Sequence, residues 1–513
     1  MTSKIQKFLT DPQTEATEGP EVQSIRQLAN TVTSGMLWSL LGIGISKGAS
    51  FGAQLVLGWL LSTEDFALYA IAISWSTIGM ALRNGGTQRL LIQKGAQYSE
   101  LAAIYLKIAL IFNTMSFGLL AISAPFLSAL YESPLLNQMM WLLGLSIPLG
   151  SAATIFQARL SFNLEFARSA RLTIWSTILR YASMVLFAWA GLGPLSFVLP
   201  LILVPLFETV ISWHWVGGWP INHVLTWPTL RQVLLDTRWV MLTALASALT
   251  VNGDYIAVSL LQSKEVLGVY FFGFQLSLAL VVLFTSSLDT VMMPTFSFLN
   301  TNTVRQTAMF KKGVRLLTVG STFACFALLI SAEALIHQLW AGKWDSAIPV
   351  VQLLSLSMPV RLIVPLCRAI LEARGEWKVV SILFIFDGMG TILAGAIGAW
   401  SGGLITIAAV VSGYNFLFGL FYCGAAALKI RAPLKDIFRP IMSTLGIGAM
   451  ATVIGLLLSI LGTLDITSFW QVAIVLVIYS GAYVALIKAF LGESFSDVIN
   501  LALRRIPRIP CSG

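Results

Sequence analysis

Charged residues are scarce in this chain. Asp, Glu, Lys and Arg make up only 11% of its 513 residues, whereas hydrophobic residues make up 57%. The mean hydropathy is +0.82. A water-soluble domain normally carries about 25% charged residues, so this composition excludes one. The chain is therefore predicted to be an all-α polytopic membrane protein.

Histidine and cysteine are also rare, which limits the chemistry that the chain can support. It has three histidines and four cysteines, namely His214, His223, His337, Cys325, Cys367, Cys423 and Cys511. The cysteines are far apart in sequence, and the first three lie in apolar segments, so neither a disulfide framework nor a CxxC metal site is expected. The motifs GxxxxGK[ST], HExxH and GxSxG are missing. We therefore expect no bound cofactor or metal, no ATP hydrolysis and no enzymatic activity.

The first 30 residues are polar and lack the apolar core of a cleavable signal. Residues 1–33 are therefore predicted to be a retained cytoplasmic tail. Beyond this tail, apolar segments of about 20 residues or more recur along the chain. Fourteen candidate spans are predicted, at approximately 34–61, 66–92, 101–130, 136–157, 169–190, 194–216, 239–261, 266–298, 313–336, 347–371, 379–400, 404–428, 438–461 and 469–491.

Basic residues are distributed unevenly between the two sides of these spans. The N-terminal tail, the even-numbered loops with the span segments that flank them, and the C-terminal tail together hold 26 of the 32 Lys and Arg residues, and only Lys264 and Lys343 fall in the opposite loops. By the positive-inside rule, both termini are expected in the cytoplasm. The same asymmetry accounts for the net charge of +9 without a nucleic-acid partner. No outer loop is long enough for a separate domain, so the function is expected within the membrane.

The sequence also contains a weak internal repeat. Leu145-Ser146-Ile147-Pro148 precedes Leu356-Ser357-Met358-Pro359 by 211 residues, and Leu60-Leu61 with Tyr69 is echoed by Leu260-Leu261 with Tyr270. Two six-helix lobes of the same orientation would explain both matches. The predicted division is a first lobe at 34–216, a connector at 217–238, a second lobe at 239–428, two additional spans at 429–491 and a cytoplasmic tail at 492–513.

The connector between the lobes is predicted to contain a short amphipathic helix. Two Trp-Pro steps interrupt it, and Trp227, Leu230, Val233 and Leu234 follow at helical spacing. Such a helix would lie on the inner leaflet of the membrane and tether the lobes while letting them rock. An ordinary polar loop is the alternative interpretation.

Ionisable residues at membrane depth are the main functional candidates, because each costs roughly 2.5–3.5 kcal/mol to insert unless it is paired or hydrated. Three are cations and four are carboxylates, namely Lys47, Arg83, Arg361, Glu208, Asp254, Asp289 and Asp387. Across a cavity, the three cations could hold a phosphate or pyrophosphate. The carboxylates could bind a coupling cation or proton, Na⁺ or H⁺, or simply neutralise Arg361. Ion pairing within each lobe, serving only helix packing, is the competing interpretation.

Several of these segments resemble a known family. The run from Leu60 to Ala70, LLSTEDFALYA, is similar to the turn after the first helix of bacterial polysaccharide flippases of the multidrug/oligosaccharidyl-lipid/polysaccharide exporter superfamily. Residues 86–94, GTQRLLIQK, resemble the end of their second helix, and Asp254 followed by Gly268-Val269-Tyr270 matches a common position. Thr63 and Ala67 replace the usual Pro and Gly of the first turn.

The resemblance implies two six-helix lobes in a V, located in a bacterial cytoplasmic membrane. It also implies that the cargo is an undecaprenyl-pyrophosphate-linked oligosaccharide, moved by alternating access to the outer leaflet. Membrane lipids and the polysaccharide polymerase and export machinery would be its partners. A cation-coupled multidrug exporter of the same superfamily remains an alternative, as does a membrane glycan polymerase, although such enzymes generally need a long outer loop.

Overall fold

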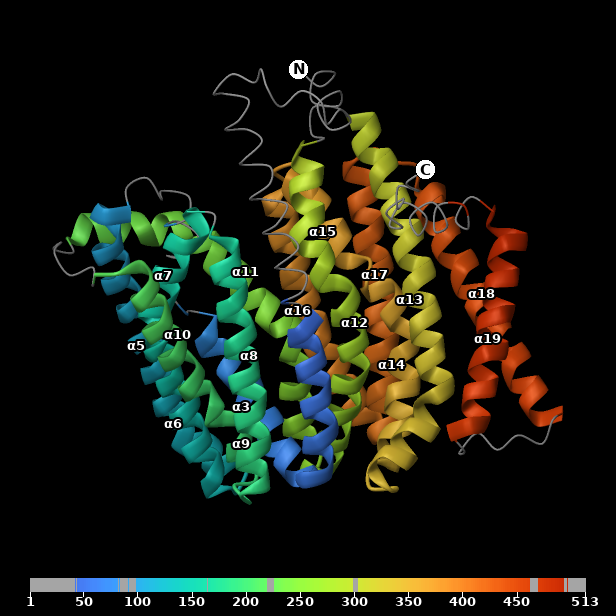
Figure 1. Cartoon of the computed structure of the whole chain (residues 1–513), viewed down its shortest axis with the longest axis horizontal. Coiled ribbons are helices and arrows are strands. Elements are labelled where there is room, and N and C mark those ends of the chain that lie inside the picture. The colour runs from blue at the N-terminus through green and yellow to red at the C-terminus, as the bar shows by residue number, and fades with distance from the viewer. Residues whose placement is uncertain are drawn as a thin grey trace, which may run out of the picture.

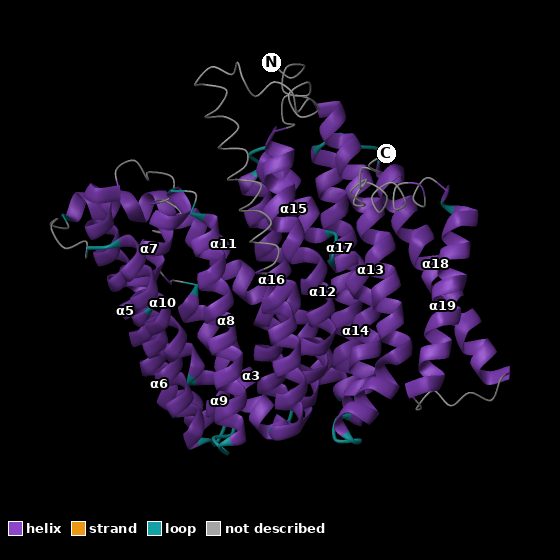
Figure 2. Cartoon of the chain, in the orientation of Figure 1, coloured by secondary structure: helices purple, strands orange, loops and turns teal. Residues whose placement is uncertain are grey.

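The computed structural model describes residues 44–81, 98–163, 165–218, 226–298, 303–461 and 469–492, together with Gly42, Arg83, Leu91 and Ser496. Within these ranges the chain consists of helices and loops, as Figure 2 shows. The predicted all-α membrane fold is confirmed. Ten described helices are long and apolar enough to cross a membrane, and an eleventh span is added if the bent pair Pro134–Leu149 and Ser151–Phe162 is counted as one.

The helices form two groups and a terminal pair (Figure 1). The N-terminal group begins with the helical segment 44–60 and continues with α3 (Thr63–Met80), α5 (Tyr98–Leu130), α6 (Pro134–Leu149), α7 (Ser151–Phe162), α8 (Phe166–Trp189), α9 (Leu195–Val198) and α10 (Pro200–Val216). The C-terminal group contains α11 (Trp227–Leu261), α12 (Lys264–Phe298), α13 (Thr303–Trp340), η3 (Asp345–Ala347), α14 (Ile348–Arg361), α15 (Val364–Ala373), α16 (Trp377–Ser401) and α17 (Leu404–Lys429). The pair consists of α18 (Leu434–Leu461) and α19 (Phe469–Phe490).

Eleven of the fourteen predicted spans have a counterpart among these membrane-length helices. The other three, 34–61, 66–92 and 266–298, fall on segments that are only partly described. The count of fourteen therefore stays a prediction. The pair α18 and α19 packs on α13, where Tyr479 and Tyr483 are buried and the Tyr483 hydroxyl donates to the Val319 carbonyl at 2.8 Å.

The connector differs from its predicted form at its C-terminal end. The sequence predicts a connector that ends at Arg238, followed by a separate span, but α11 runs without a break from Trp227 to Leu261. Val233 is buried in a cluster with Tyr98 of α5 and Ile155 of α7, whereas Trp227 is exposed. In Figure 1 the start of α11 accordingly lies beside α5 and α7. One face of this amphipathic segment thus packs on α5 and α7. Periodicity identifies the apolar face of a helix but not the helices that cover it.

Each group contains a helix that breaks directly after the repeated Leu-Ser-x-Pro sequence. In the N-terminal group α6 ends at Leu149, and α7 continues at an angle of 41°. In the C-terminal group α14 ends at Arg361, and α15 begins at Val364. Proline removes one helical hydrogen bond, and a serine that donates to the carbonyl three residues earlier favours bending. Ser146 and Ser357 both donate in this way, at 2.6 and 3.0 Å.

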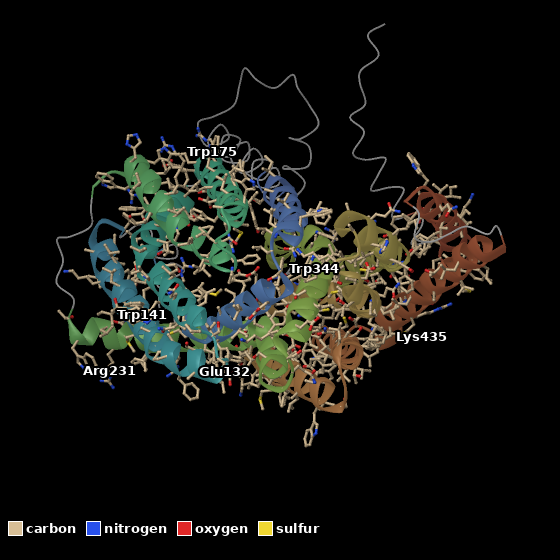
Figure 3. All side chains as sticks on the ribbon, turned by 90° about the horizontal axis from the view of Figure 1, so that it is seen from below. Glu132, Trp141, Trp175, Arg231, Trp344 and Lys435 are labelled. Carbon is tan, nitrogen blue, oxygen red and sulfur yellow. The ribbon has the colours of Figure 1, made fainter. Side chains whose placement is uncertain are left out.

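The two groups meet in an aromatic contact that we call the seam, defined by Phe66, Tyr69, Phe271, Phe272 and Trp344. Phe272 stacks on Trp344 with ring centroids 3.9 Å apart, and Phe66 packs edge-on against both rings. Seen from below, Trp344 lies near the centre of the molecule (Figure 3). In the predicted topology, the seam is at the outer ends of the helices.

Local sequence explains why α3 and α12 can come together at the seam. Ser62 caps α3 through a capping box with Asp65, whose backbone N–H donates to the Ser62 hydroxyl at 3.2 Å. This box fixes the turn in which Thr63 and Ala67 replace the family's usual residues. On the facing helix, Gly268 has no Cβ, which lets α12 lie directly against the Thr63 carbonyl.

Candidate functional site

Among the candidate residues whose side chains are described, Asp254 is the most deeply buried. Its side chain on α11 is 1% exposed and accepts hydrogen bonds from the Tyr270 hydroxyl at 2.7 Å and from the Tyr255 N–H at 3.0 Å. Glycines allow α16 to approach it closely, since a Cβ on Gly395 would lie only 2.9 Å from the Asp254 Cα. The carboxylate is thus held rigidly, with hydrogen-bond donors on two helices.

Asp387 on α16 is half-buried and is fixed by the neighbouring helix α17. The Tyr414 hydroxyl donates to the Asp387 main-chain carbonyl at 3.1 Å and lies 3.3 Å from Oδ1. A Cβ on the adjacent Gly388 would lie 3.0 Å from the Ala246 carbonyl oxygen of α11. The close crossing of α11 and α16 therefore places Asp387 near Thr250, one helical turn before Asp254 on α11.

Arg361 is the last residue of α14, at the helix break, and is half-buried. Its Nη1 donates to Oδ1 of Asn415 at 2.5 Å, and its guanidinium lies over the Phe274 ring at 5.8 Å. The Arg361 charge acts electrostatically on both Asp254 and Asp387. These three predicted residues are therefore brought together, with one cation facing two carboxylates.

Two predicted residues of the N-terminal group, Arg83 and Glu208, lie near the other helix break. Arg83 is exposed, and a Cβ on Gly150 would lie 2.9 Å from its Nη2. Glu208 of α10 acts electrostatically on Arg83 and also accepts a hydrogen bond from Nε2 of Gln157 at 3.2 Å. Gly150 thus leaves room for a guanidinium beside the break.

Two predicted residues are placed less fully. Lys47 is half-buried in the segment 44–60, next to Ser46, whose hydroxyl lies 3.1 Å from that of Thr177. Asp289 falls within α12, but its side chain lies outside the described residues. Among the described contacts, none joins Arg361 to Lys47 or Arg83, so the three predicted cations are not seen as one site. Their role in anion binding stays a prediction.

Lys343 was not identified as a site residue from the sequence. Its ammonium donates to the carbonyls of Gly58, Trp59 and Leu61 at 3.0, 3.0 and 2.7 Å. The last carbonyls of a helix lack partners within the helix, so Lys343 caps the segment 44–60 from the other half of the chain. Burial lowers the pKa of this ammonium, and the nearby Asp65 carboxylate opposes that shift.

Two indoles complete this cap. Trp340 donates through Nε1 to the Leu55 carbonyl at 3.0 Å, and Trp344 donates to the Gly58 carbonyl at 2.9 Å. A separate ion pair lies at the seam, where Nζ of Lys264 is 4.0 Å from Oε1 of Glu64. A signal for these contacts was present in the sequence, because Lys264 and Lys343 are the two basic residues of the predicted outer loops.

A cavity of about 280 Å³ opens beside the seam and is lined from both groups. Its polar lining includes Tyr131 and Glu132 from the end of α5, and Ser259, Gln262 and Lys264 from the turn between α11 and α12. The hydroxyls of Tyr131 and Ser259 lie 2.7 Å apart and join the groups. In Figure 3 Glu132 lies on the face seen from below.

Two cysteines lie closer together than their separation in sequence suggests. The Sγ atoms of Cys367 on α15 and Cys423 on α17 are 3.5 Å apart, and both thiols are free and buried. The pair sits in the apolar core of the C-terminal group. It contributes to packing between α15 and α17.

Comparison with known proteins identifies relatives along nearly the whole chain. A family model described as "Polysaccharide biosynthesis protein" matches residues 56–349. The "Succinoglycan biosynthesis transport protein ExoT" of Rhizobium meliloti (strain 1021) is 24% identical over 94% of this chain and 98% of its own length. The "Teichuronic acid biosynthesis protein TuaB" of Bacillus subtilis (strain 168) is 21% identical over 83% of this chain and 89% of its own.

Solved structures with the same fold are transporters. The "Lipid II flippase MurJ, inward closed conformation" superposes with a TM-score of 0.68 at 15% identity, covering 90% of this chain and 99% of its own. An inward-facing multidrug resistance MATE family transporter gives a TM-score of 0.58 at 12% identity, covering 77% of this chain and 96% of its own. At these identities the likeness establishes the fold.

Proposed function

Because the chain belongs to the polysaccharide biosynthesis protein family, we propose that it moves a lipid-linked polysaccharide precursor across the bacterial cytoplasmic membrane. The cargo is an undecaprenyl-pyrophosphate-linked oligosaccharide, carried from the cytoplasmic to the outer leaflet. Both termini are cytoplasmic, and the polysaccharide polymerase and export machinery act on the product. The printed names of the relatives, a succinoglycan transport protein and a teichuronic acid biosynthesis protein, support this class of cargo.

The observation that carries the proposal is the exposed cation at the first helix break. Arg83 is exposed beside Gly150. Glu208, the carboxylate that acts on Arg83, also accepts a hydrogen bond from Gln157. Lys47, which is half-buried, adds a second cation in the same helix group. A guanidinium and an ammonium are the groups that bind phosphate in proteins, the former with two parallel hydrogen bonds. We assign the pyrophosphate to Lys47 and Arg83.

Arg361, the third cation of the predicted anion site, has a different environment. It faces the carboxylates of Asp254 and Asp387, and its guanidinium is bonded to Asn415. A phosphate approaching Arg361 would be repelled by both carboxylates. Its proposed role is therefore to neutralise these acids, which is the alternative that the sequence left open for it.

Alternating access requires the seam to open and close. In the present structure the two groups are joined there by stacked aromatic rings and by the Tyr131–Ser259 contact. Release of cargo to the outer leaflet would separate these residues and break the cap that Lys343, Trp340 and Trp344 place on segment 44–60. In the predicted topology, these contacts support a cytoplasm-facing state as one step of the proposed cycle.

The proposal is tested by following the lipid-linked oligosaccharide after depletion of the protein. We expect the precursor to accumulate on the cytoplasmic leaflet, where externally added reagents cannot modify it. Lys47→Ala and Arg83→Ala should each reduce export about tenfold to a hundredfold, since a hydrogen bond to a charged group contributes about 1.5–3 kcal/mol.

Arg168→Ala provides a matched control. This arginine pairs with Glu165 at an exposed site, so export should remain near that of the unaltered protein. Normal export by both Lys47→Ala and Arg83→Ala at normal protein levels would contradict the site. Normal precursor distribution after depletion would contradict the function itself.

A cation-coupled multidrug exporter is the second candidate, because the fold is shared with MATE transporters. In that case Asp254, Asp387, Glu208 and Asp289 would be the coupling candidates. Resistance to cationic drugs on overexpression, without any change in surface polysaccharide, would favour it over the precursor flippase.

A further inference from the structure

The carboxylates of the C-terminal group belong to a closed network of side chains. Asp254 accepts from Tyr270 of α12, and one turn further along α12 the Phe274 ring lies beneath the Arg361 guanidinium. Tyr270 and Phe274 pack against each other with ring centroids 6.0 Å apart. The network therefore links Asp254 to Arg361 through two neighbouring rings.

The other half of the network runs through α17. Arg361 donates to Asn415, and the adjacent residue, Tyr414, contacts Asp387. Asp387 in turn lies near Thr250 of α11, one helical turn before Asp254. Five helices thus fix one guanidinium in the electrostatic field of two acids, and Asn415, which holds it, is only 5% exposed.

The residues of this network do not fit a bound Na⁺ or other coupling cation. Such an ion needs several oxygen ligands whose lone pairs are not already used by a hydrogen-bond donor or by another cation. Here the Asp254 oxygens accept from Tyr270 and from a backbone N–H, and Arg361 supplies a fixed positive charge nearby. In a low-dielectric interior two like charges at short range repel strongly.

We propose that Arg361 is a built-in cation that replaces a coupling metal ion in this chain. The guanidinium supplies one permanent positive charge to Asp254 and Asp387 at the place where a coupling cation would otherwise bind, so translocation proceeds without binding Na⁺. Only the transport readout of this inference rests on the proposed function, because the cation requirement can also be measured on the purified protein.

The first test uses the unaltered protein. Precursor translocation in proteoliposomes is compared in Na⁺, K⁺ and N-methylglucamine media of equal ionic strength, and thermal unfolding is measured in the same three media. We expect equal rates and equal unfolding temperatures. A translocation rate that depends on Na⁺ overturns the inference. If no medium supports translocation, the proposed function fails instead, and the unfolding measurements still test the cation requirement.

The second test removes the built-in charge. Arg361→Met leaves two buried carboxylates without their cation, and we expect translocation in N-methylglucamine to fall at least about tenfold. Adding Na⁺ or free guanidinium should restore activity and raise the unfolding temperature, because either ion can then occupy the vacated position. Absence of any response to both ions contradicts the inference.

Three further variants sharpen this test. Arg361→Lys keeps the charge and should remain independent of Na⁺. Arg361→Met combined with Asp254→Asn and Asp387→Asn removes all three charges and should fold without responding to either ion, so a response in this variant counts against the inference. Arg180→Met removes a half-buried arginine from α8 in the other group and should show no cation dependence. If Arg361→Met does not fold, the ion-replacement test on the unaltered protein decides.

Discussion

The two helix breaks are equivalent in sequence but differ in charge. The offset of 211 residues that aligns the two Leu-Ser-x-Pro segments also places Gly150 opposite Arg361. At the first break Arg83 reaches in from the end of α3 and its guanidinium lies where a Gly150 side chain would begin. At the second break the arginine is part of the broken helix itself. Both groups therefore bring a guanidinium to the break by different routes.

The surroundings of the two guanidinium groups explain why their roles should differ. Arg83 is exposed and is influenced by a single carboxylate, Glu208, whereas Arg361 is half-buried and faces Asp254 and Asp387. An exposed cation that faces only one carboxylate can still bind an anionic ligand. One that is outnumbered by buried acids mainly balances them. Both groups thus have a guanidinium at a helix break, and the neighbouring residues distinguish the roles that we expect for the two.

The largest expected effect is on stability at the second break. In Na⁺-free buffer Arg361→Met should lower the free energy of unfolding by about 3–5 kcal/mol, because it strands buried carboxylates. Arg83→Met should cost less than about 1 kcal/mol, since an exposed charge pair contributes little. Unfolding of the purified variants in detergent measures both. Equal losses at the two positions would contradict the comparison.

A second contrast concerns the seam, to which the two outer lysines contribute unequally. Lys343→Met removes the donor to the carbonyls of Gly58, Trp59 and Leu61 and should weaken the closed seam by about 1.5–3 kcal/mol. Lys264→Met breaks only a 4.0 Å contact with Glu64 and should weaken the closed seam by less than about 1 kcal/mol.

Accessibility measures this difference directly. A cysteine introduced at Ser259, which touches Tyr131 inside the closed seam, should react faster with a membrane-impermeant thiol reagent when Lys343 is replaced than when Lys264 is. The native buried cysteines serve as the unreactive background. Similar rates in the two backgrounds would show that the cap does not hold the seam closed.

The repeat predicts a third difference, between Ala67 and Gly268. The offset of 201 residues that aligns Tyr69 with Tyr270 also aligns these two positions. Gly268→Ala places a methyl group against the Thr63 backbone and should cost about 1–3 kcal/mol. Ala67→Gly adds only the helix penalty of about 1 kcal/mol. Denaturant titration of both variants checks the order, and a smaller loss for Gly268→Ala would show that α12 can shift away from α3.

Much of the fold could be predicted from the sequence because its signals are local. Apolar runs indicated the helices, and the repeated Leu-Ser-x-Pro segments precede the two places where a helix breaks. The intramembrane charges were found because they are costly in lipid. Their grouping around Arg361 was only one of the alternatives that the sequence left open, since burial at the α11–α16 crossing depends on glycines from distant helices.

What the sequence missed depends on contacts between distant residues. Lys343 reaches carbonyls more than 280 residues earlier in the chain, and Cys367 meets Cys423 across two helices. The continuity of α11 across Arg238 was missed because the polar positions of a helix that packs on protein look like those of a surface connector. Periodicity shows which face of a helix is apolar, but not what covers that face.

The smallest expected effect on stability comes from Gly150→Ala, which tests the first break alone. The new Cβ would lie 2.9 Å from Nη2 of Arg83, so the flexible guanidinium must move by a few tenths of an ångström or more. Stability should change by less than about 1 kcal/mol, because alanine favours helix formation over glycine and Arg83 can adjust. Export should nevertheless fall, since the displaced guanidinium no longer meets the pyrophosphate. Gly118→Ala on α5, where a Cβ meets open space, is the matched control and should leave export unchanged. If Gly150→Ala exports normally, the position of the Arg83 guanidinium at the break is not what binds the cargo.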